Sequence, residues 1–338
     1  MDLAELNRIA NALVTPGKGV LAADESAGTV KKRFEVIGVE CTEDNRRDYR
    51  ELLFRSKGMA NISGVILFDE TIRQKAKDGT PLVKVIELAG ALPGIKVDRG
   101  TKPLPFCPGE VVTEGLDGLR ERLIEYRELG ARFAKWRAVI DIGAGIPSYA
   151  CVNANAHALA RYAALCQDES IVPIVEPEVL MDGNHDVDRC AEVTEFVLKT
   201  VYEQLYYARV KLEGTVLKPN MVVAGKKSAK QPSVAEVAEK TIRVLKACVP
   251  AAVPGIAFLS GGQSDLDATA RLDAMNKIGG LPWKLSFSFS RALQAAPQKA
   301  WAGKSENVPA ARQAFAHRAH MNGLASLGQW NPQLEQGA

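Results

Sequence analysis

The sequence predicts an α/β protein built as a single (β/α)8 barrel, a TIM barrel, spanning residues 1–338. Three observations support this prediction. Eight short runs rich in valine, isoleucine and leucine follow one another along the chain, and each is too short for a typical helix. The segments between them are long enough for one helix and its loops. No linker rich in proline, glycine or serine divides the chain, which favours one barrel over a doubly wound sheet.

The eight expected strands share a nearly continuous apolar character, which a parallel strand requires when helices cover both of its faces. Barrels of this kind carry their chemistry at the carboxyl ends of the strands, so each strand also predicts part of a site. In chain order the strands are GVLAAD (19–24), GVILFD (64–69), GIKVD (94–98), FAKWRAV (133–139), VPIVEPEVL (172–180), GTVLKPNM (214–221), GIAFLSGG (255–262) and KLSFSFS (284–290).

Helices are expected between the strands and at both ends of the barrel. Residues 1–16 have an amphipathic pattern with acidic residues, which predicts an extra N-terminal helix and differs from a signal or transit peptide. The segment after residue 291 supplies the last helix, and residues 326–338 are expected to form a flexible C-terminal tail. Between the third and fourth strands, one buried helix face is predicted by the spacing of Leu116, Leu119, Leu123, Tyr126 and Leu129, with Gly130 as the helix end.

Composition and charge exclude several classes of protein. Apolar residues make up 46% and charged residues 25% of the chain, as in an ordinary folded domain. The 43 Lys and Arg residues nearly balance the 40 Asp and Glu residues, and no block of five like charges occurs, so we expect no nucleic-acid partner. No apolar run approaches the roughly 18 residues of a membrane span. The six cysteines lack metal-binding spacing and, as reduced thiols, indicate a cytoplasmic protein.

Charged side chains are concentrated at the carboxyl ends of the expected strands. A single charge at such a place is usually just solvated, and a barrel can also hold one structural lysine–glutamate pair. Burying many charges without a ligand or full pairing would be costly, so a convergent set predicts a binding site. The set comprises Asp24, Asp69, Lys96, Lys135, Arg137, Glu176, Glu178, Lys218, Ser260 and Arg291.

Lys218 is the most informative of these residues because it follows a buried strand and precedes Pro219, which ends regular strand pairing. Loss of solvation there should lower the pKa of its amine, and repulsion by Lys135 on another strand would lower it further. A neutral lysine can attack a ketone and form an iminium ion. The iminium acts as an electron sink, which makes cleavage of a neighbouring carbon–carbon bond feasible.

This chemistry needs a group that moves protons. Glu176, flanked by apolar residues and proline, is a candidate with a raised pKa. Glu178 follows it on the same face of the strand. Asp24, within LAADES, is a second candidate base.

Two turns indicate phosphate binding. Ser260-Gly261-Gly262 follows the seventh strand and Ser290-Arg291 follows the eighth, which is the loop pair where barrels often bind phosphate through backbone N–H groups. A Ser-Gly-Gly turn by itself more often has a structural role, so the prediction of a phosphate site depends on the position of this turn after the seventh strand. A second cluster near the first and third strands suggests a substrate with a phosphate at each end, and it consists of Ser26, Arg33 and Lys96.

Seven segments together resemble the class I, Schiff-base-forming fructose-1,6-bisphosphate aldolases, from about Gly17 to about Ala325: LAADES, GVILF, GIKVD, FAKWR, VPIVEPE, EGTVLKPNM and FLSGGQS. The resemblance implies a barrel that reversibly cleaves fructose 1,6-bisphosphate to dihydroxyacetone phosphate and glyceraldehyde 3-phosphate, in glycolysis and gluconeogenesis. It also implies a lyase that uses no metal or other cofactor, binds a small sugar bisphosphate and is usually a homotetramer.

The resemblance further implies a role for each candidate catalytic residue. Lys218 resembles the Schiff-base lysine, and Glu176 resembles the acid/base of iminium formation and hydrolysis. Asp24 resembles the group that handles the proton of the C4 hydroxyl. Lys135 resembles the second active-site lysine, and its electrostatic partners are matched by Glu178 and Arg137.

The phosphate sites match the family less completely. Ser260, Gly261 and Arg291 resemble the first phosphate site, and the other end of the pocket is matched by Ser26, Arg33 and Lys96. After the eighth strand the family usually reads Ser-aromatic-Gly-Arg, whereas this chain has Ser290 where the glycine approaches phosphate. If this position needs a positive φ, the serine will be strained.

The tail departs from the family as well. Some members, the animal enzymes among them, end in a tyrosine that helps protonate the enamine after the aldehyde leaves. The last tyrosine of this chain is Tyr207. Glu335 or the terminal carboxylate could approach the site from a flexible tail, although neither resembles a phenol in pKa. We therefore expect enamine protonation to be slower, or to fall to Glu176 or water.

Three other functions compete with this interpretation. A zinc-dependent aldolase needs several convergent ligands, and this chain has four dispersed histidines, His157, His185, His317 and His320. A Schiff-base aldolase or transaldolase for another sugar phosphate, such as sedoheptulose 1,7-bisphosphate or fructose 1-phosphate, stays open. A non-catalytic scaffold would be expected to lack at least one of four residues, and this chain has them all: Lys218, Glu176, Asp24 and Lys135. Their presence is compatible with a second, binding role.

Overall fold

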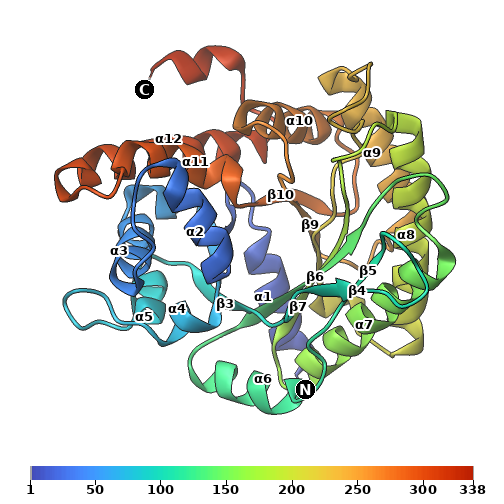
Figure 1. Cartoon of the computed structure of the whole chain (residues 1–338), viewed down its shortest axis with the longest axis horizontal. Coiled ribbons are helices and arrows are strands. Elements are labelled where there is room, and N and C mark those ends of the chain that lie inside the picture. Colours follow the sequence, from blue (N-terminus) through green and yellow to red (C-terminus); the bar gives the residue numbers. More distant parts are fainter. Residues whose placement is uncertain (1, 338) are drawn as a thin grey trace.

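The eight barrel strands lie where the sequence predicts them. In this computed structural model, which describes residues 2–337, they pair in parallel and close in the order β1-β10-β9-β8-β7-β6-β3-β2. The predicted barrel is confirmed, and helices surround it (Figure 1). The strands are β1 (Gly19–Ala23), β2 (Ile62–Leu67), β3 (Leu92–Lys96), β6 (Phe133–Ile140), β7 (Val172–Val179), β8 (Val216–Leu217), β9 (Gly255–Phe258) and β10 (Lys284–Phe289).

The connections are more elaborate than one helix per strand. Two helices each follow β1, β2 and β10, and a two-stranded antiparallel ribbon, β4 (Thr101–Pro103) and β5 (Val111–Thr113), follows β3. Short 3-10 turns occur at η1 (Lys57–Asn61), η2 (Leu212–Gly214), η3 (Ser305–Asn307) and η4 (Pro332–Gly337). The helices are α1 (Leu3–Leu13), α2 (Ala27–Val36), α3 (Glu43–Phe54), α4 (Asp69–Arg73), α5 (Leu82–Leu88), α6 (Leu119–Glu128), α7 (Tyr149–Asp168), α8 (Val187–Tyr207), α9 (Val234–Cys248), α10 (Asp265–Ile278), α11 (Arg291–Trp301) and α12 (Val308–Ala325).

Helix α1, the predicted N-terminal helix, closes the amino end of the barrel. Its residues Ile9 and Leu13 belong to one buried cluster with Phe133 of β6. The approach is close: a β-carbon on Gly255 would lie 2.5 Å from Cγ2 of Val14, which follows the helix. Apolar side chains therefore fill this end, and the polar cavity lies at the carboxyl ends of the strands.

Strand β8 is the shortest, and its end determines where Lys218 stands. The N–H of Lys218 still donates to the carbonyl of Val175 at 2.8 Å, as in the ladder. Pro219 has no N–H with which to continue that ladder, so regular pairing ends there, as predicted. Lys218 is thereby held at the mouth of the barrel by the neighbouring strand.

The C-terminal segment differs from the flexible tail expected for residues 326–338. Its described part, which ends at residue 337, is docked on α10 and α12. The N–H of Trp330 donates to Oδ1 of Asp273 at 2.9 Å, and Arg318 Nη1 donates to Oε2 of Glu335 at 2.6 Å. The contacts form because Trp330 buries its indole and Glu335 meets an arginine that is itself buried. Ala338, with the terminal carboxylate, lies outside the described residues.

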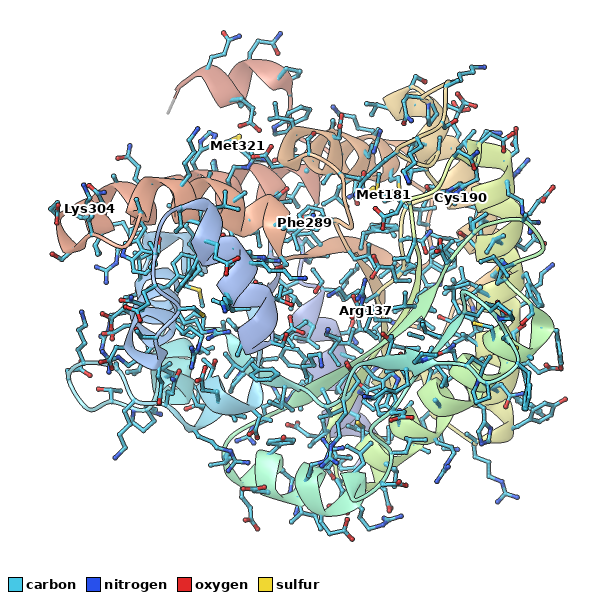
Figure 2. All side chains as sticks on the ribbon, viewed as in Figure 1. Arg137, Met181, Cys190, Phe289, Lys304 and Met321 are labelled. Atoms are coloured by element: carbon cyan, nitrogen blue, oxygen red, sulfur yellow. The ribbon has the colours of Figure 1, made fainter. Side chains whose placement is uncertain are left out.

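All six cysteines are free thiols, and three of them are buried. Figure 2 shows Cys190 on α8, in the outer layer of helices, whereas Arg137 lies near the centre of the view, at the mouth of the barrel. Burial raises the pKa of the Cys190 thiol, which favours the protonated form. Among residues 2–337, no helix is both long enough and apolar enough to cross a membrane.

Candidate active site

One cavity of about 1110 Å³ opens at the carboxyl ends of the barrel strands. Every residue that the sequence nominates for catalysis or phosphate binding lines it, although these residues come from seven of the eight strand ends and from the helices that follow. They are Asp24, Ser26, Arg33, Lys96, Lys135, Arg137, Glu176, Glu178, Lys218, Ser260, Gly261, Ser290 and Arg291.

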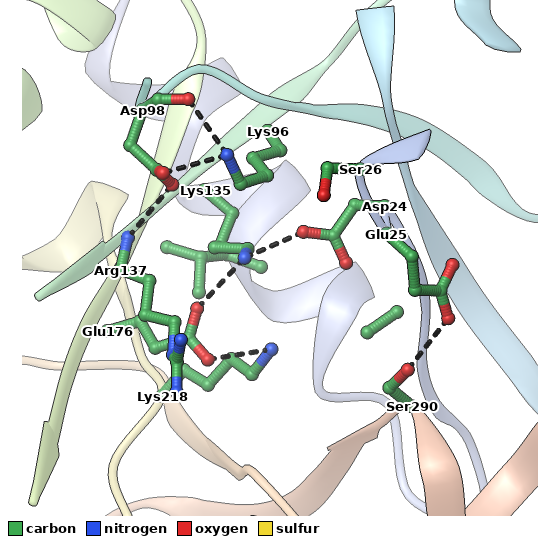
Figure 3. Close-up of polar contacts among 12 residues, drawn as sticks. Asp24, Glu25, Ser26, Lys96, Asp98, Lys135, Arg137, Glu176, Lys218 and Ser290 are labelled. Carbon is green, nitrogen blue, oxygen red and sulfur yellow. Dashed lines mark hydrogen bonds and ion pairs between the residues drawn. The ribbon is translucent and has the colours of Figure 1, made fainter. Parts of the chain in front are cut away.

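A row of four buried charges of alternating sign crosses the floor of this cavity (Figure 3). Lys135 Nζ lies 2.7 Å from Oδ2 of Asp24 and 3.2 Å from Oε2 of Glu176. The other oxygen of Glu176 lies 3.1 Å from Lys218 Nζ. All four residues are at most 8% exposed. Two positive and two negative charges balance, which makes their joint burial tolerable.

Glu176 separates the two lysine amines. Its carboxylate is a counter-charge between them, so the direct repulsion that the sequence suggested between Lys135 and Lys218 is screened. The contact of Lys135 with Oε2 is an ion pair without hydrogen-bond geometry, and no donor within the described chain satisfies that oxygen.

The pKa of Glu176 is opposite to the sequence-based expectation of a raised value. Burial raises the pKa of this carboxyl, but the positive charges of Lys135 and Lys218 outweigh burial and lower it overall. Burial likewise raises the pKa of Asp24, and the same two lysines bring it down to about 2. Both carboxyls are therefore ionised at neutral pH. The sequence showed the apolar neighbours of Glu176 but not the charges that face it.

Lys135 stays charged in this environment. Burial lowers the pKa of its ammonium, and the adjacent carboxylates of Asp24 and Glu176 more than offset that effect and raise the pKa. The ammonium is thus a fixed positive charge between two carboxylates. This arrangement orients both carboxylates and stabilises negative charge that develops beside it.

A second set of ion pairs forms one wall of the cavity. The guanidinium of Arg137 pairs with Glu178, and the backbone N–H of Arg137 donates to Oδ2 of Asp98 at 3.3 Å. The other oxygen of Asp98 lies 2.8 Å from Lys96 Nζ. The sequence nominated Arg137, Glu178 and Lys96 but missed Asp98, although it stands at the end of GIKVD, two residues after Lys96.

The loops after β9 and β10 meet at the opposite wall. Ser260 is buried, and Gly261 takes a positive φ of 56°, which a side chain would strain. The guanidinium of Arg291 donates to the carbonyl of Gly261, which joins the two loops. The first helical turn of α11 begins at Arg291, so its N–H groups add to this cationic end of the cavity.

Ser290 is not strained. Its φ is −105°, a value open to any residue, so the expected penalty for replacing glycine by serine does not arise. Its Oγ donates to Oε1 of Glu25 at 2.9 Å. Nε2 of Gln294 donates to the same oxygen of Glu25 at 2.7 Å. The sequence predicted a role for neither residue, although Glu25 directly follows Asp24 and Gln294 lies one helical turn after Ser290.

The cluster of Ser26, Arg33 and Lys96 is divided in the structure. Ser26 caps α2 by accepting the N–H of Thr29 at 3.4 Å, and Lys96 is held by Asp98. Arg33 lies with the other wall instead, since its Nη2 donates to Oγ of Ser290 at 3.1 Å. Arg33 therefore lies beside Ser290, which precedes Arg291, and Figure 3 shows Lys96 well away from Ser290, on the side of Asp98.

The histidines lie elsewhere. Within residues 2–337, none of the four lines the cavity, and no three His, Cys, Asp or Glu side chains are grouped as metal ligands would be. His317 instead holds the C-terminal segment, with Nε2 2.8 Å from Oε2 of Glu335.

Comparison with known proteins decides the family. The family described as fructose-bisphosphate aldolase class-I matches residues 5–338. The chain belongs to the class I fructose-bisphosphate aldolases. It is 57% identical over 332 residues to the probable class 1 aldolase of Xanthomonas campestris pv. campestris, covering 98% of this chain and 99% of that one. Cytosolic fructose-bisphosphate aldolase 6 of Arabidopsis thaliana is 55% identical, with 97% and 93% of the two chains covered.

A solved aldolase has the same fold. The structure of fructose-bisphosphate aldolase from Plasmodium falciparum superposes with a TM-score of 0.96 at 48% identity, covering 97% of this chain and 96% of that one. Class I is the metal-independent, Schiff-base type of aldolase. This aldolase is therefore a carbon–carbon lyase that cleaves fructose 1,6-bisphosphate reversibly, the reaction of such enzymes in glycolysis.

Proposed function

We propose that Lys218 forms the Schiff base with C2 of fructose 1,6-bisphosphate, and that Glu176 and Asp24 move the protons of the reaction. The observation that carries this proposal is the 3.1 Å contact between Lys218 Nζ and Glu176 Oε1 at the buried end of β8. Lys218 must lose a proton before its nitrogen can attack a carbonyl carbon, and a carboxylate at this distance can accept that proton.

Glu176 serves the formation of the iminium ion. It accepts a proton from Lys218, the amine attacks C2, and Glu176 returns the proton toward the former carbonyl oxygen. Two of the three ammonium protons leave with that oxygen as water, and the third remains on the iminium nitrogen. The low resting pKa of Glu176 suits this cycle, because the carboxyl is ionised before each turnover and is protonated only while the lysine is neutral.

Asp24 serves carbon–carbon cleavage. It accepts the proton of the C4 hydroxyl, and the electron pair of the C3–C4 bond moves into the iminium to give an enamine and glyceraldehyde 3-phosphate. Lys135, 2.7 Å away, stabilises the negative charge that develops at the C4 oxygen. Protonation of the enamine at C3, by Glu176 or water, and hydrolysis then release dihydroxyacetone phosphate and restore Lys218.

The two walls supply the phosphate sites of this proposal. Ser260, Gly261, Arg291 and the backbone N–H of Ser290 bind one phosphate, with Arg33 beside them, and Ser26 and Lys96 serve the other end of the substrate. Glu178 and Arg137 form an ion pair in the wall between the two phosphate sites.

We further propose that the protein is a homotetramer in the cytoplasm, a location supported by the cytosolic relative in Arabidopsis. Light scattering with size-exclusion chromatography tests the tetramer, and a monomer would contradict it.

Borohydride trapping tests the central assignment. Incubation with dihydroxyacetone phosphate and sodium borohydride, followed by peptide mass spectrometry, should place the reduced adduct on Lys218. Lys135 is the internal control because it lies in the same cavity, is equally buried and stays protonated. An adduct on Lys135, or no adduct while fructose 1,6-bisphosphate is still cleaved, would overturn the assignment.

A further inference from the structure

Ser290 directly precedes helix α11, yet its hydroxyl does not cap that helix. Serines in the same position elsewhere in the chain do cap their helices. Ser233, for example, accepts the N–H of Glu236 at 3.2 Å at the start of α9. Ser290 instead turns its Oγ across the cavity toward Glu25 (Figure 3). The hydroxyl therefore makes a contact between segments, in addition to accepting from Nε2 of Gln294 in its own helix at 3.4 Å.

That contact joins four side chains. Ser290 Oγ donates to Oε1 of Glu25 at 2.9 Å and accepts from Nη2 of Arg33 at 3.1 Å. Arg33 also pairs with Glu25 through Nη1, and Gln294 Nε2 donates to the same carboxylate oxygen at 2.7 Å. The hydroxyl thus bridges a carboxylate and a guanidinium that already form an ion pair. It connects the segment after the first barrel strand with the segment after the last one.

The bridge is partly shielded from water. The side chain of Glu25 is 8% exposed and that of Arg33 is 19% exposed, so both charges are substantially desolvated. A hydrogen bond to a charged group in such surroundings is stronger than one at a fully solvated surface. Because the backbone of Ser290 has an ordinary negative φ, the hydroxyl is the feature that distinguishes serine from glycine at this place.

We infer that Ser290 is a positioning residue that sets the affinity for a substrate phosphate by holding the guanidinium of Arg33 in place. The inference rests on the proposed function only in that it takes the anion to be a phosphate of the substrate. A guanidinium that is already ordered loses less conformational freedom when the phosphate binds, so affinity is higher. Ser290 acts here through Arg33, not on the reacting carbon atoms.

Binding and kinetics of Ser290→Ala test this role. The variant should weaken binding of inorganic phosphate to the resting protein, measured by isothermal titration calorimetry, by about tenfold, the size expected for one lost hydrogen bond to a charged group. KM for fructose 1,6-bisphosphate should rise by a similar factor with kcat nearly unchanged. Ser290→Thr keeps the hydroxyl and should restore both values. Ser233→Ala is the matched control: it removes a capping hydroxyl and should lower Tm without changing phosphate binding.

A double-mutant cycle shows whether Ser290 acts through Arg33. In an Arg33→Met background, Ser290→Ala should cause no further loss of phosphate binding. If the methionine variant does not fold, Arg33→Lys supplies a second background that keeps a positive charge beside Glu25. Additive losses, an unchanged phosphate affinity in Ser290→Ala, or a threonine variant as weak as alanine would each overturn the inference. Phosphate titration needs no turnover, so a failure of the proposed catalytic roles would be recognised separately by the absence of the Lys218 adduct.

Discussion

Replacing Lys135 by methionine should both destabilise the protein and abolish most of its activity. The ammonium contacts Asp24 at 2.7 Å and Glu176 at 3.2 Å, and it is 4% exposed. The variant retains two buried carboxylates and one buried ammonium, that of Lys218. Leaving one buried charge without its partner costs about 3–5 kcal/mol of unfolding free energy.

The pKa of Asp24 depends on the same interaction. Its folded value of about 2 lies below its ordinary value of 3.8. A lowered folded pKa contributes stability that is present above the ordinary value and is lost as pH falls through the folded one, here about 2 kcal/mol. Without Lys135 the pKa of Asp24 should rise by about 1 to 3 pH units. The gap in unfolding free energy between wild type and variant should therefore narrow as pH falls from about 4 to about 2.

Urea unfolding at several pH values measures both effects. Asp24→Asn combined with Lys135→Met leaves Glu176 and Lys218 as a balanced pair. The double variant should therefore be less destabilised than the sum of the two single variants, by about 1–3 kcal/mol. Lys102→Met, which changes an exposed lysine on β4, is the control and should alter stability by no more than about 0.5 kcal/mol.

Two results would refute this reasoning. Strictly additive effects of Asp24→Asn and Lys135→Met would mean that the two side chains are not coupled in the folded protein. If the difference in unfolding free energy between wild type and Lys135→Met does not become smaller as pH falls from about 4 to about 2, Lys135 does not lower the pKa of Asp24. Turnover by Lys135→Met should also fall by about 10²-fold or more, as expected for a lost preorganised charge.

Three further outcomes are expected. Asp24→Asn should still form the borohydride-trapped adduct but cleave fructose 1,6-bisphosphate at least about 10²-fold more slowly, because the C4 proton loses its proposed acceptor. Equal losses of both steps would contradict the separate roles proposed for the two carboxyls. Turnover should survive EDTA, and its loss with rescue by Zn²⁺ would contradict a metal-independent reaction. Deleting residues 331–338 should lower Tm, because buried Arg318 loses its ion pair with Glu335. The exchange of the dihydroxyacetone phosphate proton with solvent should stay nearly unchanged. A selective fall in that exchange would show that the C-terminal segment takes part in protonating the enamine.

Local patterns in the sequence were sufficient for the barrel and for the place of Lys218. Each apolar run is long enough to be a buried strand, and each segment between two runs is long enough for a helix and its loops. Few folds other than a barrel or a doubly wound sheet alternate strands and helices in this way. Pro219 ends the sixth barrel strand for a local reason, the missing N–H, so the residue before it could be placed at the mouth of the barrel. The polar residues at strand ends could be nominated for the same reason, because parallel strands bring their carboxyl ends together.

The sequence by itself thus indicated most of the strand-end side chains of the proposed site, because strand ends and turns follow from neighbouring residues, although it missed Asp98 and Glu25. Only the tertiary structure decided how these residues pair. The pKa of Glu176 depends on Lys135 and Lys218, which face it from the two adjacent strands. Arg33 meets Ser290 across 257 positions of sequence. Such contacts are set by how strands and helices pack against one another, and electrostatic interactions act through the distances that packing creates, which no local pattern of residues encodes.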